Sequence, residues 1–270
     1  MRDEVIESIS VPGAPRIVLD AAGEGELVFF LHGIGGNRSN WRDQVTALSS
    51  HFRTVAWDAR GWGGSDDYEG PLDFADFSAD LERVLDYLGA EAAHLVGLSM
   101  GGFIAQDFYA RRPSRVRSLV LADTSKGMLA EHGPAWIENF LALRRKPLLE
   151  GKSPRDIAPE VVKSLAGPRA GPAVLHRLEE SIAALRRDSY LKAMETVSRY
   201  VIPLDYGSVR VPTLVISGAD DRLIEPQASQ RLADAIPGAR FAVIPDAGHL
   251  SNIEQPEAFN RLVLDFLRTR

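Results

Sequence analysis

The chain has 270 residues, of which 45% are hydrophobic and 25% charged, and its formal net charge is −6. A chain of this length buries roughly three quarters of its unfolded surface, enough for a substantial core, either as one domain or as one domain with an insertion. The absence of cysteine excludes disulfides, thiolate metal sites and a cysteine nucleophile. The negative charge and the lack of a basic stripe argue against nucleic-acid binding.

Membrane insertion is not expected either. No segment approaches the about 18–20 uninterrupted apolar residues of a membrane span. The start Met1-Arg2-Asp3-Glu4 lacks the apolar core of a signal peptide. We therefore expect a cytoplasmic protein.

Strand and helix patterns alternate through the first half of the chain. Expected strands cover residues 5–11, 16–20, 27–31, 53–57, a segment ending at Leu98, and 116–122. Expected helices cover about 40–49, a segment with apolar residues from Phe77 to Leu88 on one face, and a segment following Ser99. This alternation predicts an α/β fold with a mostly parallel central sheet flanked by helices.

The most informative stretch is Gly97-Leu98-Ser99-Met100-Gly101, where a strand gives way at once to a helix. A serine on such a turn has a strained backbone that exposes its hydroxyl, and the flanking glycines leave the turn free of clashes. The N-terminus of the helix also directs unpaired N–H groups at the same point. We interpret the stretch as a nucleophile elbow.

The alternation stops between about residues 124 and 206. Four helix-like patterns follow one another there, separated by proline and glycine. A helical insertion between two strands must lie over an edge or the top of the sheet, so we interpret it as a cap. Strands at 211–217 and 240–244 and a final helix at about 256–267 complete the chain.

Polar residues follow each of these last two strands. Gly218-Ala219-Asp220-Asp221 comes after the first, and Pro245-Asp246-Ala247-Gly248-His249 after the second. Loops at the carboxyl ends of parallel strands gather in one crevice, so distant residues can meet there. The order serine, acid, histidine is that of the α/β-hydrolase catalytic triad.

Over nearly its whole length the chain resembles the α/β-hydrolase superfamily. The matching segments are His32-Gly33, the loop of residues 58–65, the elbow, and the acid and histidine loops. The run 32–37 and the run 247–256 look most like those of the 3-oxoadipate enol-lactonase and small carboxylesterase group. The resemblance implies a core of residues 1–123 and 207–270 and a helical cap of residues 124–206, inserted after the sixth strand.

In such proteins the serine is the nucleophile and the histidine its general base, which here would be Ser99 and His249. The acid comes three residues after the turn glycine, which selects Asp221. We assign Asp220 to the turn or to capping the next helix, and Asp123, after the sixth strand, remains a second alternative. The resemblance also implies that the N–H groups of Ile34 and Met100 form the oxyanion hole.

Substrate contacts are expected from the insertion and from the loop after the third strand. Trp41, Trp136 and Phe140 are candidates for an apolar pocket, and Arg144 is the candidate for binding a substrate carboxylate. The glycines of residues 33–36 lack the Lys-Ser/Thr of a phosphate-binding loop. No residues show metal-ligand spacing, so we expect no metal and no cofactor.

These patterns together predict a cofactor-independent serine hydrolase that cleaves an ester, a lactone or a related small carbonyl substrate through an acyl-enzyme. Carbon–carbon bond hydrolases of aromatic catabolism, which act on diketones, are the nearest alternative, and perhydrolases are another. A slow-turnover ligand receptor on the same fold is an alternative of a different class. The identity of the substrate, the oligomeric state and the position of the cap are left open.

Overall fold

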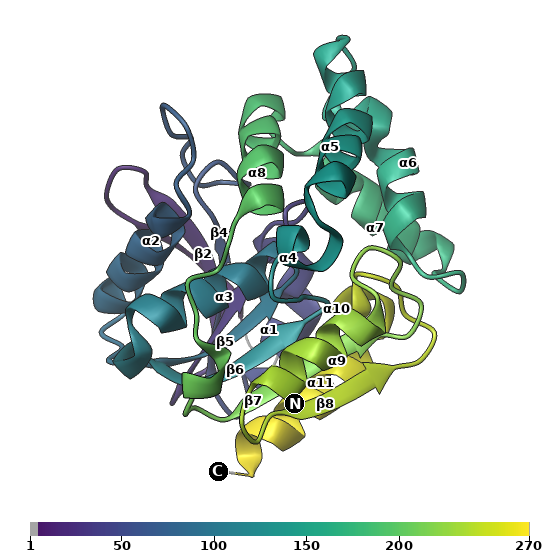
Figure 1. Ribbon diagram of the computed structural model, residues 1–270. Coiled ribbons are helices and arrows are strands. Elements are labelled where there is room, and N and C mark those ends of the chain that lie inside the picture. Colours follow the sequence, from purple (N-terminus) through teal and green to yellow (C-terminus); the bar gives the residue numbers. More distant parts are fainter. Residues whose placement is uncertain (1–4, 270) are drawn as a thin grey trace.

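An eight-stranded sheet forms the centre of residues 5–269, the part of the chain that the computed structural model describes (Figure 1). Residues 1–4, on which the expectation of no signal peptide rests, and residue 270 lie outside it. The strand order is β1-β2-β4-β3-β5-β6-β7-β8. The first two strands pair antiparallel and β3 to β8 run parallel. Their bounds are β1 Glu7–Val11, β2 Ile17–Ala22, β3 Leu27–Leu31, β4 Arg53–Asp58, β5 Ala93–Leu98, β6 Val116–Ala122, β7 Thr213–Gly218 and β8 Arg240–Ile244.

Helices cover both faces of the sheet. The core helices are α1 (Arg42–Leu48), α2 (Phe74–Tyr87), α3 (Met100–Arg111), α9 (Pro226–Ala235), α10 (Ser251–Glu254) and α11 (Pro256–Arg268). Alternate residues of β3 face opposite sides: Val28 and Phe30 pack with α1 and α11, while Phe29 and Leu31 pack with α2, α3 and α9. All of these side chains are buried, so the strand has the continuous apolar sequence of a doubly covered parallel sheet.

Two helical predictions differ from the structure. The expected helix at 40–49 is a 3₁₀ turn, Arg38–Trp41, followed by α1, and Asn37 caps the turn by accepting a hydrogen bond from the Ser39 N–H at 2.9 Å. The insertion contains five helices among its described residues instead of four. The extra one, α4 (Met128–His132), lies between Gly127 and Gly133 and is too short to produce an apolar period.

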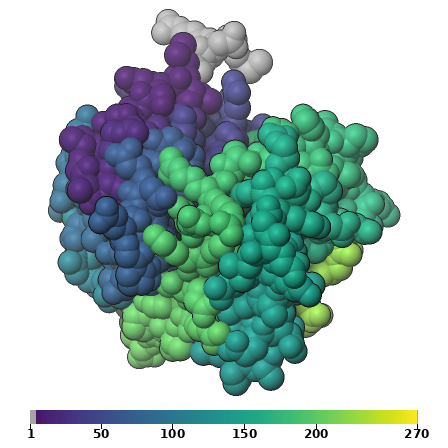
Figure 2. Space-filling model, turned by 90° about the horizontal axis from the view of Figure 1, so that it is seen from above, coloured from purple at the N-terminus to yellow at the C-terminus, as the bar shows by residue number. Residues whose placement is uncertain are grey.

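The other four helices of the insertion are α5 (Pro134–Leu149), α6 (Pro154–Leu165), α7 (Pro172–Ala183) and α8 (Arg187–Arg199). They lie above the sheet in Figure 1, and seen from above in Figure 2 their teal and green surface covers the middle of the molecule. Ser181 of α7 donates a hydrogen bond to the Gly35 carbonyl at 3.0 Å, and Ser189 of α8 donates one to Asp67 at 2.8 Å. The insertion is therefore bonded to the loops that follow β3 and β4.

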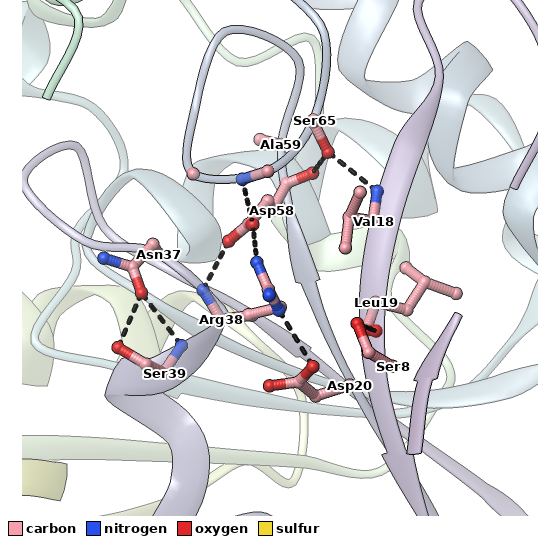
Figure 3. A network of polar contacts seen from close by, with 12 residues as sticks. Ser8, Val18, Leu19, Asp20, Asn37, Arg38, Ser39, Asp58, Ala59 and Ser65 are labelled. Carbon is pink, nitrogen blue, oxygen red and sulfur yellow. Dashed lines mark hydrogen bonds and ion pairs between the residues drawn. The ribbon is translucent and has the colours of Figure 1, made fainter. Parts of the chain in front are cut away.

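A buried carboxylate joins these two loops to each other (Figure 3). Asp58, at the end of β4, is fully buried and accepts hydrogen bonds from the N–H groups of Arg38 at 2.8 Å and Gly64 at 2.7 Å. The Arg38 guanidinium forms an ion pair with Asp58 and reaches Asp20 at 2.9 Å. A side chain at Gly63, whose φ is +46°, would overlap this carboxylate. The network fixes the loop that begins at His32 against the end of β4.

We expect Asp58→Ala to lower the free energy of unfolding by about 3 kcal/mol or more, because it leaves the N–H groups of Arg38 and Gly64 without an acceptor and the Arg38 guanidinium with Asp20 alone. Asp20→Ala is the matched control, since it removes the other carboxylate of the same guanidinium at a site with 27% side-chain exposure. Its expected cost is about 1 kcal/mol or less. Urea unfolding of both variants measures the difference, and equal costs would contradict a dominant role for Asp58.

Candidate active site

Ser99 occupies a strained turn between β5 and α3. Its backbone has φ 53° and ψ −116°, a region that side-chain-bearing residues rarely adopt. A methyl group added at Gly97 would lie 2.3 Å from the Gly101 carbonyl oxygen, and one at Gly101 would lie 2.0 Å from that of Leu31. The sequence Gly-x-Ser-x-Gly is thus required by close backbone approach, and the turn holds the half-buried Ser99 side chain at the carboxyl edge of the sheet.

His249 and Asp221 meet Ser99 at this edge. The Nε2 atom of His249 lies 2.9 Å from Ser99 Oγ, and its Nδ1 atom lies 2.7 Å from Asp221 Oδ2. Both the histidine and the aspartate are only 3% exposed. The other oxygen of Asp221 accepts hydrogen bonds from the N–H groups of Leu223 at 2.9 Å and Ile224 at 3.0 Å. Three side chains separated by up to 150 residues therefore form one hydrogen-bonded row.

The direction of these hydrogen bonds follows from charge. A carboxylate only accepts, so Nδ1 of His249 carries the proton facing Asp221, and Nε2 of the neutral ring accepts from the Ser99 hydroxyl. Burial lowers the pKa of His249, but the charges of Asp221, Asp123 and Glu254 outweigh it and raise the pKa above its ordinary value. The imidazole is consequently a stronger proton acceptor than a free histidine.

The two alternative acids occupy different positions. Asp220 lies in the turn after β7, where its N–H donates to the Ala247 carbonyl at 2.8 Å, and its side chain makes no hydrogen bond within residues 5–269. It does not cap the next helix, because that helix begins after Glu225. Asp123 is fully buried and accepts hydrogen bonds from Gly218 N–H at 2.8 Å and Ser251 Oγ at 2.6 Å. Its carboxylate therefore joins the acid loop to the histidine loop instead of bonding the imidazole.

The two backbone N–H groups expected to form the oxyanion hole have no acceptor among the described helix and loop contacts. Met100 begins α3, so its N–H has no acceptor within the helix. The Ile34 N–H makes no hydrogen bond with the described residues, while the Ile34 carbonyl accepts one from Trp62 Nε1 at 2.9 Å. His32 supports this loop as a neutral ring: burial lowers its pKa, and its Nε2 accepts from the Ala59 N–H at 3.1 Å.

A partly open cavity of about 70 Å³ extends from Ser99 and His249 into the insertion. Its walls are mainly apolar, and four helices of the insertion contribute to them. These wall residues are Phe140 of α5, Val161 of α6, Leu178 and Ile182 of α7, and Tyr190 and Met194 of α8. A lining of this composition fits a small, largely apolar group.

Only some of the candidate substrate contacts line this cavity. Trp41, Phe140 and Arg144 line the cavity, but Trp136 does not. Trp136 is instead stacked between His132 and Phe140, with ring centroids 4.0 Å and 4.9 Å away, so its expected place in the pocket wall is corrected. Trp136 and Phe140 lie one turn apart on the same side of α5, so the apolar period could not distinguish them. Phe140 lines the cavity, and Trp136 lies behind it in the stack.

Tyr190 was not singled out by any sequence pattern. It is 3% exposed, it lines the cavity, and its hydroxyl makes no hydrogen bond within the described residues. Burial raises the pKa of Tyr190, and the nearby Arg144 charge opposes that rise. Arg144 donates a hydrogen bond to Ser164 Oγ at 2.6 Å and lies over the Phe140 ring, and it forms no ion pair with a carboxylate of residues 5–269.

Residues 5–269 contain neither a candidate metal-binding cluster nor a helix that could cross a membrane. No group of three or more histidine, aspartate or glutamate side chains could hold a metal ion. No helix in this range has both the length and the apolar run that crossing a bilayer requires.

The choice between the adjacent aspartates can be measured. Asp221→Asn should lower kcat for a short ester by about 10³–10⁴-fold, because the amide favours the wrong imidazole tautomer. Asp220→Asn should stay within about twofold of the wild-type protein, since its side chain bonds nothing. Steady-state kinetics of both purified variants decides, and a comparable loss in the second would reverse the assignment.

Comparisons with known proteins agree with this architecture. Residues 26–256 match the family described as alpha/beta hydrolase fold. A 2-hydroxy-6-oxononadienedioate/2-hydroxy-6-oxononatrienedioate hydrolase of Paraburkholderia phymatum is 33% identical, covering 93% of this chain and 91% of that protein. A thermophilic esterase from Thermogutta terrifontis, solved with malate bound, superposes with a TM-score of 0.87 at 28% identity, covering 97% of this chain and 98% of the other.

The enol-lactonase from Burkholderia xenovorans LB400 superposes with a TM-score of 0.86 at 27% identity, covering 97% of this chain and all of the other. The predicted fold and the predicted resemblance are thereby confirmed. With most of its length matched to the family and with the sheet order described above, the chain belongs to the α/β hydrolase fold family and is a hydrolase.

Proposed function

We propose that this protein is a serine hydrolase that cleaves a small ester or lactone through an acyl-enzyme, with Ser99, His249 and Asp221 as its catalytic triad. The row of hydrogen bonds at 2.9 Å and 2.7 Å, ending at the cavity, is the observation that supports this most directly. The esterase and the enol-lactonase among the similar structures act on the same kinds of bond, according to their names.

The chemistry follows from the direction of the hydrogen bonds. Ser99 Oγ attacks the carbonyl carbon while its proton passes to Nε2 of His249, and Asp221 stabilises the imidazolium. The imidazolium then protonates the leaving alkoxide, which leaves the acyl group bonded to Ser99. A water molecule attacks this acyl-enzyme and gives its proton to His249. The acid departs when that proton returns to Ser99 Oγ, so the enzyme ends as it began.

Negative charge on the substrate oxygen needs donors at both tetrahedral steps. We assign this role to the N–H groups of Ile34 and Met100, which are the free donors on either side of Ser99. One such preorganised donor typically contributes about 3–4 kcal/mol of transition-state stabilisation. The Asp58 network and the Trp62 hydrogen bond hold the loop of Ile34 in place before substrate arrives.

We further propose that residues 124–206 act as a cap that selects the substrate. Four of its helices contribute walls of the cavity, whereas the core contributes the reacting groups. Arg144 and Tyr190 bring a cation and an unbonded hydroxyl to the cavity, and both can donate to an oxyanion. The fit is best for a substrate whose acyl part ends in a carboxylate. The relative from Paraburkholderia phymatum, whose named substrates are dioates, and the esterase solved with malate bound agree with an acidic substrate.

The nucleophile is tested with p-nitrophenyl acetate and butyrate. Wild-type protein should show a burst of about one p-nitrophenol per active site, followed by a slower steady state, because acylation precedes hydrolysis of the acyl-enzyme. Ser99→Ala should abolish the burst and lower kcat by about 10⁴-fold or more. An active Ser99→Ala protein would contradict the proposal, and release limited to a single turnover in the wild type would indicate a ligand receptor.

Carbon–carbon cleavage is the second candidate, favoured by the 33% identical relative. The two activities separate in a panel of esters, enol-lactones and vinylogous diketones assayed with the same preparation. We expect the highest kcat/KM for an ester or lactone. A diketone preferred over every ester and lactone would replace the proposed substrate class while leaving the triad assignment intact.

The carboxylate preference has its own matched pair of variants. Arg144→Met should lower kcat/KM for the mono-p-nitrophenyl ester of glutaric acid by about 10–100-fold, which corresponds to the loss of a charge-assisted hydrogen bond. The kcat/KM for p-nitrophenyl butyrate, which has no carboxylate, should change by less than about threefold. Arg145→Met is the control, because that neighbouring arginine pairs with Glu195 and does not line the cavity. Equal changes for both esters would remove the carboxylate from the proposal.

A further inference from the structure

Glu254 lies behind the catalytic histidine, and the proposed mechanism does not use it. It ends the short helix α10, is 9% exposed, and binds three backbone N–H groups. One oxygen accepts from Gly167 at 2.8 Å and from Gly248 at 3.0 Å, and the other accepts from Leu250 at 3.3 Å. Gly248 and Leu250 flank His249, whereas Gly167 belongs to the insertion, just beyond α6. A single buried carboxylate thus joins the insertion to both neighbours of the histidine.

The backbones meet directly at the same place. The N–H of His249 donates to the carbonyl of Leu165, the last residue of α6, at 2.8 Å. A methyl group added at Gly248 would lie 2.4 Å from the Gly167 nitrogen, and one added at Gly167 would lie 2.8 Å from the Gly248 nitrogen. The two segments therefore approach as closely as their backbones allow, and neither position accepts a side chain without displacing the other.

The acid loop is bonded to the same turn of the insertion. Arg222, the residue after Asp221, donates hydrogen bonds to the carbonyls of Lys163 at 2.9 Å and Ala166 at 2.8 Å. The residues from Lys163 to Gly167 are consequently bonded to both loops that carry the triad's acid and base. Carbonyl groups at the C-terminal end of a helix have no donor within the helix and usually bind water. At the end of α6 the donors are instead Arg222 of the acid loop and the N–H of His249.

We propose that Glu254 is a positioning residue that joins the last turn of α6 to the histidine loop, so that the insertion holds the imidazole of His249 in its reactive orientation. The inference rests on the proposed function of His249. It implies that this end of the insertion stays with the histidine during turnover, and that any opening of the cavity involves α5, α7 or α8 instead.

Besides orienting the imidazole, Glu254 affects the pKa of His249 through its charge. The charged groups that face His249 are Asp221 from the acid loop, Asp123 from the end of β6 and Glu254 from α10, and all three favour the protonated ring. Removing the Glu254 charge should therefore lower the pKa of His249. The imidazole must be neutral to accept the Ser99 proton, so the acid limb of the pH–rate profile should move to lower pH.

Glu254→Gln is the central variant, because it keeps the shape of the side chain and places an amide where N–H groups need an acceptor. With p-nitrophenyl acetate we expect kcat to fall at least tenfold, KM to change less than threefold, and the midpoint of the acid limb of kcat/KM to fall. Labelling of Ser99 by a fluorophosphonate should slow by a similar factor. Glu131→Gln is the control: that glutamate has 6% side-chain exposure and pairs with Arg231 of α9, and its loss should leave all three measurements within twofold.

Gly167→Ala repeats the test without touching a charge. Its methyl group should push the insertion off the histidine loop and lower kcat at least tenfold with no shift of the acid limb. If Glu254→Gln does not fold, this variant decides alone. Wild-type kcat and labelling rates in the folded variants would overturn the inference. A wild-type protein that the probe fails to label, or an active Ser99→Ala, would instead overturn the proposed function, so the two failures are distinguishable.

Discussion

The left-handed backbone at Ser99 is the constraint on which the arrangement of this protein depends. A residue with φ 53° and ψ −116° costs about 1–3 kcal/mol in strain, and it persists only where its surroundings over-determine it. Here β5 is buried throughout and α3 is buried from Met100 to Tyr109, and the backbones at the turn approach so closely that Gly97 and Gly101 have no room for a side chain. The strain holds Ser99 Oγ at the edge of the sheet, within reach of both the histidine and the cavity.

The rest of the site consists of loops that the same sheet edge brings together. These loops would separate if each were anchored only by its own strand, and buried carboxylates hold them to one another. Asp58 bonds the loop after β3 to the end of β4, and Asp123 bonds the acid loop to the histidine loop. Each side chain accepts several hydrogen bonds, which lowers the cost of burying it, although burial and the neighbouring Asp221 charge still raise the pKa of Asp123 to about 7. In the proposed mechanism this positions Ser99, His249 and the oxyanion donors before substrate binds, which is the condition for electrostatic catalysis.

The insertion shares in this positioning as well as in forming the cavity. Ser181 bonds the Gly35 carbonyl in the loop of Ile34, and Leu165 bonds the His249 N–H. The first contact lies beside Ile34, the proposed oxyanion donor, and the second holds the backbone of His249, the proposed base. If these residues act as proposed, we expect a substitution inside the insertion to change kcat as well as substrate preference, because the backbone contacts couple the two.

Local sequence determined the elements and the order of the candidate residues. The apolar run of β3, the glycines around Ser99 and the polar ends of β7 and β8 each follow from steric and solvation rules that act over a few residues, so the fold and the positions of Ser99, His249 and Asp221 could be predicted. The choice of Asp221 over Asp220 drew on the family resemblance, and the distances agree with it because Asp221, unlike Asp220, is hydrogen-bonded to His249.

Contacts between segments distant in the chain were decided only by the tertiary structure. The apolar period of α5 could not show that Trp136 is shielded from the cavity by its stack with Phe140, and the length of α4 is too small to produce a period at all. No local pattern shows that Tyr190 lies near Arg144 of α5, or that Glu254 binds Gly167, which is 87 positions away. Periodicity and turn chemistry record which side of an element is buried, whereas the partner on that side is set by packing of the whole chain.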